Sequence, residues 1–135
     1  MNDKLIYPYR LDSNARYREV VKFVMTYALA SITVPILFAR NILILPTNVS
    51  LLSIFDWEVY LSWFFCVLSI LSGLVFYYAS AVWIRLAWGE PSNLFGCKIG
   101  DNCTERILDC TFWLSILFCG IGFALIIRFF LLFVT

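Results

Sequence analysis

The chain has 135 residues, of which 62% are hydrophobic and only 14% are charged, and its formal net charge is +1. A soluble domain has about half of its residues apolar and about a quarter charged, so the composition excludes an ordinary soluble domain and equally a disordered chain. A net charge this small also gives no electrostatic footprint for nucleic acid. The composition therefore predicts an integral membrane protein.

Three segments without a charged residue, 23–39, 59–84 and 110–127, divide the chain. About 20 helical residues cross the hydrocarbon core of a bilayer, and each segment reaches this length or approaches it. Barrel strands would be shorter and would alternate in polarity, which these runs do not. The sequence predicts an all-α protein with transmembrane helices at about 19–41, 57–86 and 108–134, in a single polytopic domain over 1–135.

The N-terminal segment, 1–18, is predicted to be a basic juxtamembrane segment. Within it, Asp12 or Ser13 is a candidate N-cap for a helix that begins at about Asn14 and continues into the first span.

The basic residues predict how the chain is oriented in the membrane. Eight of the ten Lys and Arg residues lie in 1–22 or 85–109. Lys and Arg are enriched in cytoplasmic segments, so the N-terminus and the loop 87–107 are predicted to be cytoplasmic and the C-terminus to lie outside. The apolar loop 41–56 is then on the outer side, interfacial or re-entrant, and the protein is a multi-pass protein of the cell membrane.

Short side chains recur at helical spacing in each predicted span. In the second span they fall within an arc of about 60° at 100° per residue. Lipid gives helices no hydrophobic reason to associate, so close backbone approach and hydroxyl hydrogen bonds have to hold them together. Packing within one protomer, a seam in a homo-oligomer and a polar pore lining all fit these stripes, and we expect a homo-oligomer. The candidate seam residues are Ser62, Cys66, Ser69, Gly73 and Ser80, then Thr111, Ser115, Cys119 and Gly122, and Thr26, Ala30 and Thr33 in the first span.

Charged residues at the span ends form a second group of candidates, because a charge left in hydrocarbon either reaches the interface or pairs. Arg128 is expected to pair with Asp56 or Glu58. At the other membrane face, a second set of charges is expected around Asp109, three residues after Arg106. The membrane-edge charges are Arg40, Asp56, Glu58 and Arg128 on the outer side, and Arg85, Glu90, Arg106 and Asp109 on the inner side.

The residues that most chemistry needs are missing. The chain has no His, which is the commonest general base and metal ligand. The spacing of Cys97, Cys103 and Cys110 does not fit a zinc site. Cys97 and Cys103 are expected to be reduced thiols in a cytoplasmic loop, or a disulfide if the orientation is inverted. The sequence predicts no enzyme, no cofactor and no metal.

Three functional hypotheses remain. The first is a non-enzymatic membrane subunit that oligomerises and docks a cytoplasmic partner, plausible as the inner-membrane component of a bacterial system for antiviral defence or stress. The second is an immunity protein that binds a bacteriocin or toxin within the bilayer. The third is a small pore, either a channel or a holin-like protein. In every case the expected partner is the lipid bilayer, with no nucleic acid.

Overall fold

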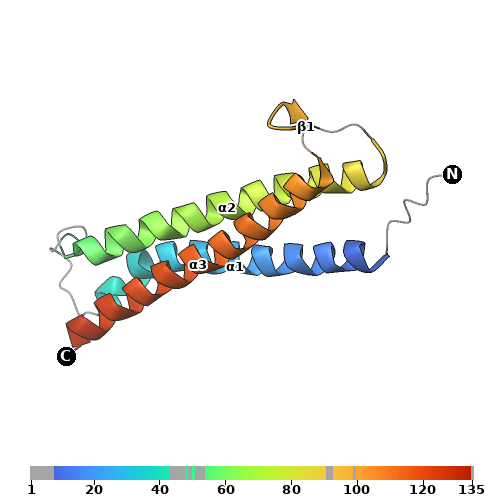
Figure 1. Cartoon of the computed structure of the whole chain (residues 1–135). Coiled ribbons are helices and arrows are strands. Elements are labelled where there is room, and N and C mark those ends of the chain that lie inside the picture. Colours follow the sequence, from blue (N-terminus) through green and yellow to red (C-terminus); the bar gives the residue numbers. More distant parts are fainter. Residues whose placement is uncertain are drawn as a thin grey trace.

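The computed structural model describes residues 8–42, 48, 50, 54–90, 93–98 and 100–134. Three long helices, α1 (Pro8–Ile42), α2 (Trp57–Ala87) and α3 (Asp101–Val134), form an elongated bundle (Figure 1). The two strands of a minimal antiparallel hairpin, β1 (Asn93–Leu94) and β2 (Cys97–Lys98), connect α2 to α3. The start of α1 and the end of α3 lie at opposite ends of the bundle, as an odd number of spans requires.

All three helices are long and apolar enough to cross a membrane, through Arg10–Leu37, Trp57–Ala87 and Asn102–Leu132. This confirms the predicted fold class, an all-helical multi-pass membrane protein with three spans.

Two helices begin earlier than the sequence predicts. The structure starts α1 at Pro8, so Asp12 and Ser13 lie inside the helix and neither is its N-cap. Proline suits a first helical turn because its φ is already helical and its missing N–H would have had no partner there. Asp12 instead accepts a hydrogen bond from Arg16 Nε at 3.0 Å, one helical turn away. Much of the expected 1–18 juxtamembrane segment is therefore helix.

The start of α3 at Asp101 also shortens the expected 87–107 loop. The first turn is closed by three donors that share the carbonyl oxygen of Gly100: the N–H groups of Cys103 and Thr104 and the Thr104 hydroxyl, at 3.1 to 3.3 Å. A helix can continue through charged residues once it has left the hydrocarbon core. The uncharged runs therefore underestimate the lengths of α1 and α3. Of the expected 41–56 loop, residues 41 and 42 belong to α1 instead, and of the remainder only residues 48, 50 and 54–56 belong to the described part of the chain.

Serine hydroxyls connect α2 to α3 along a buried seam. Ser62 Oγ donates to the Gly122 carbonyl oxygen at 2.6 Å. Seven residues away on each helix, or about two turns, Ser69 and Ser115 each donate to the other's carbonyl oxygen, at 2.7 and 3.1 Å. All three serines are fully buried. The pairing satisfies every hydroxyl and also brings the two backbones close together, as packing without a hydrophobic driving force requires.

Two glycines lie where the helices approach most closely. A Cβ on Gly122 would lie 2.7 Å from Cys66 Sγ and 3.1 Å from the Ser62 carbonyl oxygen, so Gly122 leaves room for the backbone of α2. A Cβ on Gly73 would instead meet the side chain of Met25 on α1, at 2.7 Å from its sulfur. The small-residue stripe of α2 thus serves two neighbours, α3 through its first half and α1 through its second.

We predict that Gly122→Ala destabilises the bundle by about 1–3 kcal/mol, because the added methyl group meets a backbone carbonyl that cannot move aside. Gly120 on the same helix is the matched control, since a Cβ there has nothing within 4 Å. Gly120→Ala should leave stability unchanged or raise it by up to about 1 kcal/mol. Unfolding in mixed micelles, followed by circular dichroism, measures both. Equal effects of the two substitutions would contradict the close approach of α2 and α3.

A polar and aromatic cleft at one end of the bundle

The predicted small-residue stripes do not all have the same surroundings. The five candidates of α2 are all buried, as are Ser115 and Gly122 of α3. The Sγ atom of Cys119 lies 3.6 Å from the Val24 carbonyl oxygen and links α3 to α1, whereas the Thr111 hydroxyl donates within its own helix to the Ile107 carbonyl oxygen at 2.7 Å.

The stripe of α1 faces away from the other helices. Thr26, Ala30 and Thr33 are exposed, and the two hydroxyls donate to carbonyl oxygens one turn back in α1, at 2.9 and 2.8 Å. This stripe takes no part in packing within the protomer.

One pair of membrane-edge charges comes together at the C-terminal end of α3. Arg128 Nε lies 3.2 Å from Glu58 Oε1, which is one of the two pairings expected for Arg128. Glu58 is only 4% exposed, whereas the Arg128 side chain is 65% exposed. Asp56, the other expected partner, caps α2 by accepting a hydrogen bond from the Trp57 N–H at 2.7 Å. The side chain of Arg40 lies outside the described residues.

The charges at the opposite end do not form the set that the sequence suggests. Arg85, Glu90, Arg106 and Asp109 are all exposed, and within the described part of the chain no two of them form an ion pair. The ion pair found at this end joins α1 to α3 instead, with Arg10 Nη1 3.4 Å from Glu105 Oε1.

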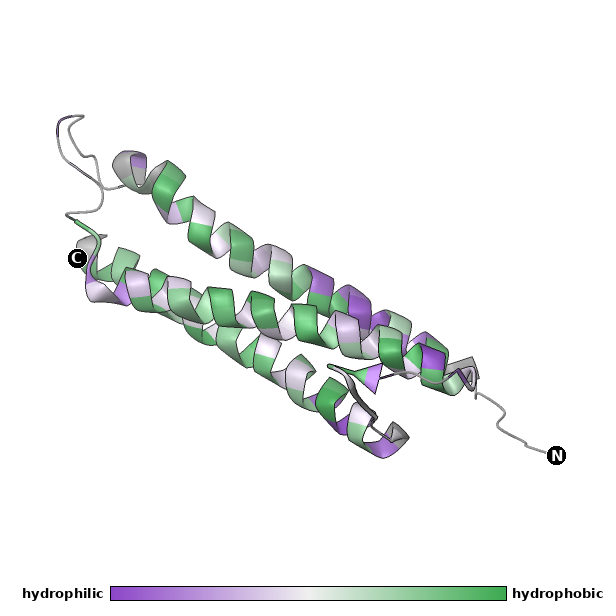
Figure 2. Cartoon of the chain, turned by 90° about the horizontal axis from the view of Figure 1, so that it is seen from above, coloured by the Kyte–Doolittle hydropathy of each residue, from purple (hydrophilic) through white to green (hydrophobic). Residues whose placement is uncertain are grey.

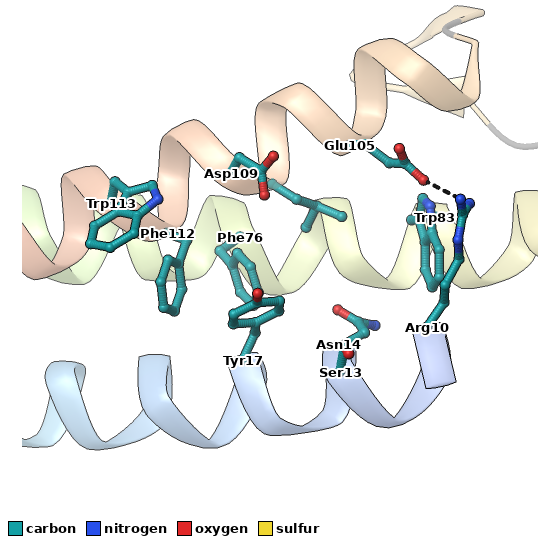
Figure 3. Close-up of a pocket in the computed structure, with 11 residues that line it drawn as sticks. Arg10, Ser13, Asn14, Tyr17, Phe76, Trp83, Glu105, Asp109, Phe112 and Trp113 are labelled. Carbon is teal, nitrogen blue, oxygen red and sulfur yellow. Dashed lines mark hydrogen bonds and ion pairs between the residues drawn. The ribbon is translucent and has the colours of Figure 1, made fainter. Parts of the chain in front are cut away.

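A cleft of about 310 Å³ opens at this same end, between the N-terminal part of α1, the C-terminal part of α2 and the N-terminal part of α3 (Figure 3). The Arg10–Glu105 pair lies at one end of it, and Tyr17 and Phe112 lie further along the helices, with their rings 5.0 Å apart in an edge-on contact. The lining residues are Arg10, Ser13, Asn14 and Tyr17 of α1, Phe76 and Trp83 of α2, and Glu105, Leu108, Asp109, Phe112 and Trp113 of α3.

Polar contacts between α1 and α2 lie next to the cleft, and one of them involves the lining residue Asn14. Buried Asn14 donates from Nδ2 to Ser80 Oγ at 2.9 Å, and Ser80 donates back to Asn14 Oδ1 at 3.1 Å. One turn further along α1, the Tyr77 hydroxyl donates to the Arg18 carbonyl oxygen at 2.8 Å, and the Arg18 guanidinium lies 5.4 Å from the Tyr77 ring centroid. These contacts fix the rotation of α1, so that Arg10, Asn14 and Tyr17 face the cleft.

Of the residues that line the cleft, Asp109 alone belongs to the predicted membrane-edge charges or small-residue stripes. One signal was available: Asn14, Val21, Ala28 and Pro35 recur every seven residues, and all four are buried. A polar residue in register with a buried helical stripe indicates a buried hydrogen bond. The ion pair and the aromatic walls come from three helices and have no comparable signature.

The lining can bind a ligand through charge, hydrogen bonds and aromatic faces, and none of its members is a thiol. Elsewhere, within the residues that the structure describes, no group of three or more Cys, Asp and Glu side chains is placed to hold a metal ion. Cys66, Cys103, Cys110 and Cys119 are free thiols, whereas the side chain of Cys97 lies outside the described residues.

Comparison with protein-family models, with curated proteins and with solved structures gave no match for this chain. The interpretation of the cleft therefore rests on its own geometry.

The contact between Glu58 and Arg128 yields a prediction about stability. Arg128→Gln leaves the Glu58 carboxylate buried without its cation. It should therefore lower the free energy of unfolding by more than the double substitution Arg128→Gln with Glu58→Gln does. We expect a coupling free energy of about 1 kcal/mol between the two positions, discounted for the exposure of Arg128. A double-mutant cycle by unfolding in micelles measures it. Arg106→Gln is the control, because Arg106 is exposed and makes no ion pair in the described part of the chain. It should leave the free energy of unfolding unchanged. If the effects of the two single substitutions are strictly additive, the ion pair between Glu58 and Arg128 does not stabilise the protein.

Proposed function

We propose that the protein is a non-enzymatic integral membrane subunit that docks a cytoplasmic partner protein on the end of the bundle that carries the N-terminus of α1. The observation that supports this is a charged helical projection at that end. Residues 8–22 of α1 precede the uncharged run 23–39, and at 1.5 Å per residue they extend about 22 Å beyond it. Residues 101–109 of α3 add a shorter helical extension of about 13 Å beside them.

The projection of α1 is charged on its exposed face. Hydrophilic residues gather along this part of α1, whereas the rest of the bundle is mostly hydrophobic (Figure 2). The exposed charged residues of this stretch are Arg10, Asp12, Arg16, Arg18, Glu19 and Lys22, four basic and two acidic. A structured surface of this kind suits recognition of a partner with an acidic surface, because complementary charges steer association and fix orientation.

The cellular setting is part of the proposal. The excess of Lys and Arg at this end supports a cytoplasmic N-terminus and an outer C-terminus. The size and the three spans are compatible with an inner-membrane component of a bacterial defence or stress system. Homo-oligomerisation is proposed through the outward stripe of Thr26, Ala30 and Thr33, since the stripes of α2 and α3 largely pack within the protomer.

The other two hypotheses gain less support. The hydroxyls that a pore would need, those of Ser62, Ser69 and Ser115, donate to the neighbouring helix. An immunity protein would need a lateral groove lined by small residues, whereas the cleft is walled by aromatic and charged residues.

Site-specific photo-crosslinking in cells tests the docking proposal. A benzophenone amino acid at exposed Glu19 on the projection, or at exposed Arg106 on the neighbouring extension of α3, should give a discrete protein adduct. The same group at exposed Phe123, within the third uncharged run, should not give that adduct. Reversing Arg16 and Lys22 to Glu should abolish the adduct, because the partner is expected to be acidic. Adducts with lipid alone at the projection, or an adduct that survives the charge reversal, would contradict the proposal.

A further inference from the structure

We propose that the cleft binds an amphiphilic organic cation, with its ammonium group beside Asp109 and its apolar chain along the outer face of α3. This inference is independent of the docking proposal, because the cleft is formed between the helices, and of the exposed charges of the projection only Arg10 also lines it.

Aromatic rings form most of the cleft wall. Five of the lining residues are aromatic: Tyr17, Phe76, Trp83, Phe112 and Trp113. Phe112 contacts three of the others, with ring centroids 5.0 Å from Tyr17, 6.1 Å from Phe76 and 5.5 Å from Trp113. The faces of aromatic rings attract cations, and a set of such rings around a small space is how proteins recognise ammonium groups.

The charges of the lining favour a positive ligand. Arg10 and Glu105 face each other as an ion pair at 3.4 Å, so they largely offset one another. Asp109 extends from α3 toward the α1 side of the cleft, and it makes no ion pair with any basic side chain in the described part of the chain (Figure 3). The lining therefore carries one positive and two negative groups, and Asp109 supplies the uncompensated charge.

A second depression continues from the same residue. A shallow groove on α3 is lined by Asp109, Cys110, Trp113, Leu114 and Leu117 and is almost entirely apolar. The cleft and the groove share Asp109 and Trp113. From Asp109 to Leu117 the helix advances about 12 Å, directed toward the middle of the apolar span. A ligand with its cation at Asp109 would thus place an attached alkyl chain against Trp113 and Leu117.

The position of the site in the membrane fits such a ligand. On α3, Asp109 is the last charged residue before the uncharged run 110–127, so we expect it near the boundary between hydrocarbon and the polar interface, although the charges of the neighbouring α1 continue as far as Lys22. An amphiphilic cation partitions to this level, with its charge in the interface and its chain in the hydrocarbon. The ammonium group can belong to an aminophospholipid of the bilayer or to a free cationic amphiphile, and the two sources are separated by competition.

The experiment uses the full chain in nanodiscs of phosphatidylglycerol, a lipid without an ammonium group. The probe is dodecyltrimethylammonium that carries a photoreactive diazirine on its chain, and labelled peptides are identified by mass spectrometry. We expect labelling in 105–117 that excess dodecyltrimethylammonium suppresses and that dodecyl sulfate does not. Adding phosphatidylethanolamine will suppress the labelling if the ligand is an aminophospholipid, and will leave it unchanged if the ligand is a free amphiphile.

Substitutions of Asp109 decide whether the site is the one proposed. Asp109→Asn should reduce the labelling about tenfold or more, because it removes a charge-assisted contact to the cation. Asp109→Glu should retain most of it. Exposed Glu90→Gln, which makes the same change in net charge outside the cleft, is the matched control and should have no effect. Asp109 is itself exposed, so its substitutions should not disturb the fold. Circular dichroism of each variant verifies this. Labelling that is equal in Asp109→Asn and wild type, or spread evenly over lipid-facing segments of all three helices, would overturn the proposal.

Discussion

The structure depends on one constraint: a hydroxyl or carbonyl that leaves water inside a membrane has to find its partner within the protein. At the seam between α2 and α3, the hydroxyls of each helix find their acceptors on the backbone of the other. Ser69 and Ser115 each donate to the carbonyl oxygen of the other, and Ser62 donates to that of Gly122. Each bond requires the two backbones to approach closely, and that approach in turn requires small residues at the crossing. Hydrogen bonding and packing at this seam are therefore a single requirement.

Helix α1 packs against the other two helices through different kinds of side chain along its length, and the cleft results from this difference. Along the membrane-spanning part, α1 packs with small or flexible side chains, such as Met25 against Gly73. At the projecting end, the contacts become long and polar: Asn14 with Ser80, Arg18 with Tyr77, and Arg10 with Glu105. Arg10, Glu105 and Tyr77 have longer side chains than the serines of the α2–α3 seam, so they need more space between the helices. The space that they leave between the three helices is the cleft, and the aromatic residues only partly fill it.

The sequence predicts the spans well because the cost of a charge in hydrocarbon is large and local, so the uncharged runs mark the spans on their own. It also marks the α2 stripe, since a row of small residues in a helix of large apolar ones indicates a place where another helix can approach closely. It does not predict which neighbour the stripe faces, because Ser69 and Gly73 lie on nearly the same side of α2 and yet contact α3 and α1 respectively. The cleft is less predictable still. The pairing of Arg10 with Glu105 spans 95 positions and depends on the register of two helices whose starting points the sequence misplaces.

The helical projection and the cleft share a structural origin in the first turns of α1. An isolated helix of this length is marginal in water, so residues 8–22 stay helical chiefly because one face packs against α2. Asn14 and Val21 are buried on that face, and both Asn14 and Tyr17 also line the cleft. The opposite face, with Asp12, Arg16 and Glu19, is then held in a fixed position as a by-product of the same packing. Loss of the Asn14–Ser80 pair would loosen both surfaces, whereas a change at Asp109, which is exposed on α3, leaves the charged face of α1 in place. This difference separates binding in the cleft from docking on the projection.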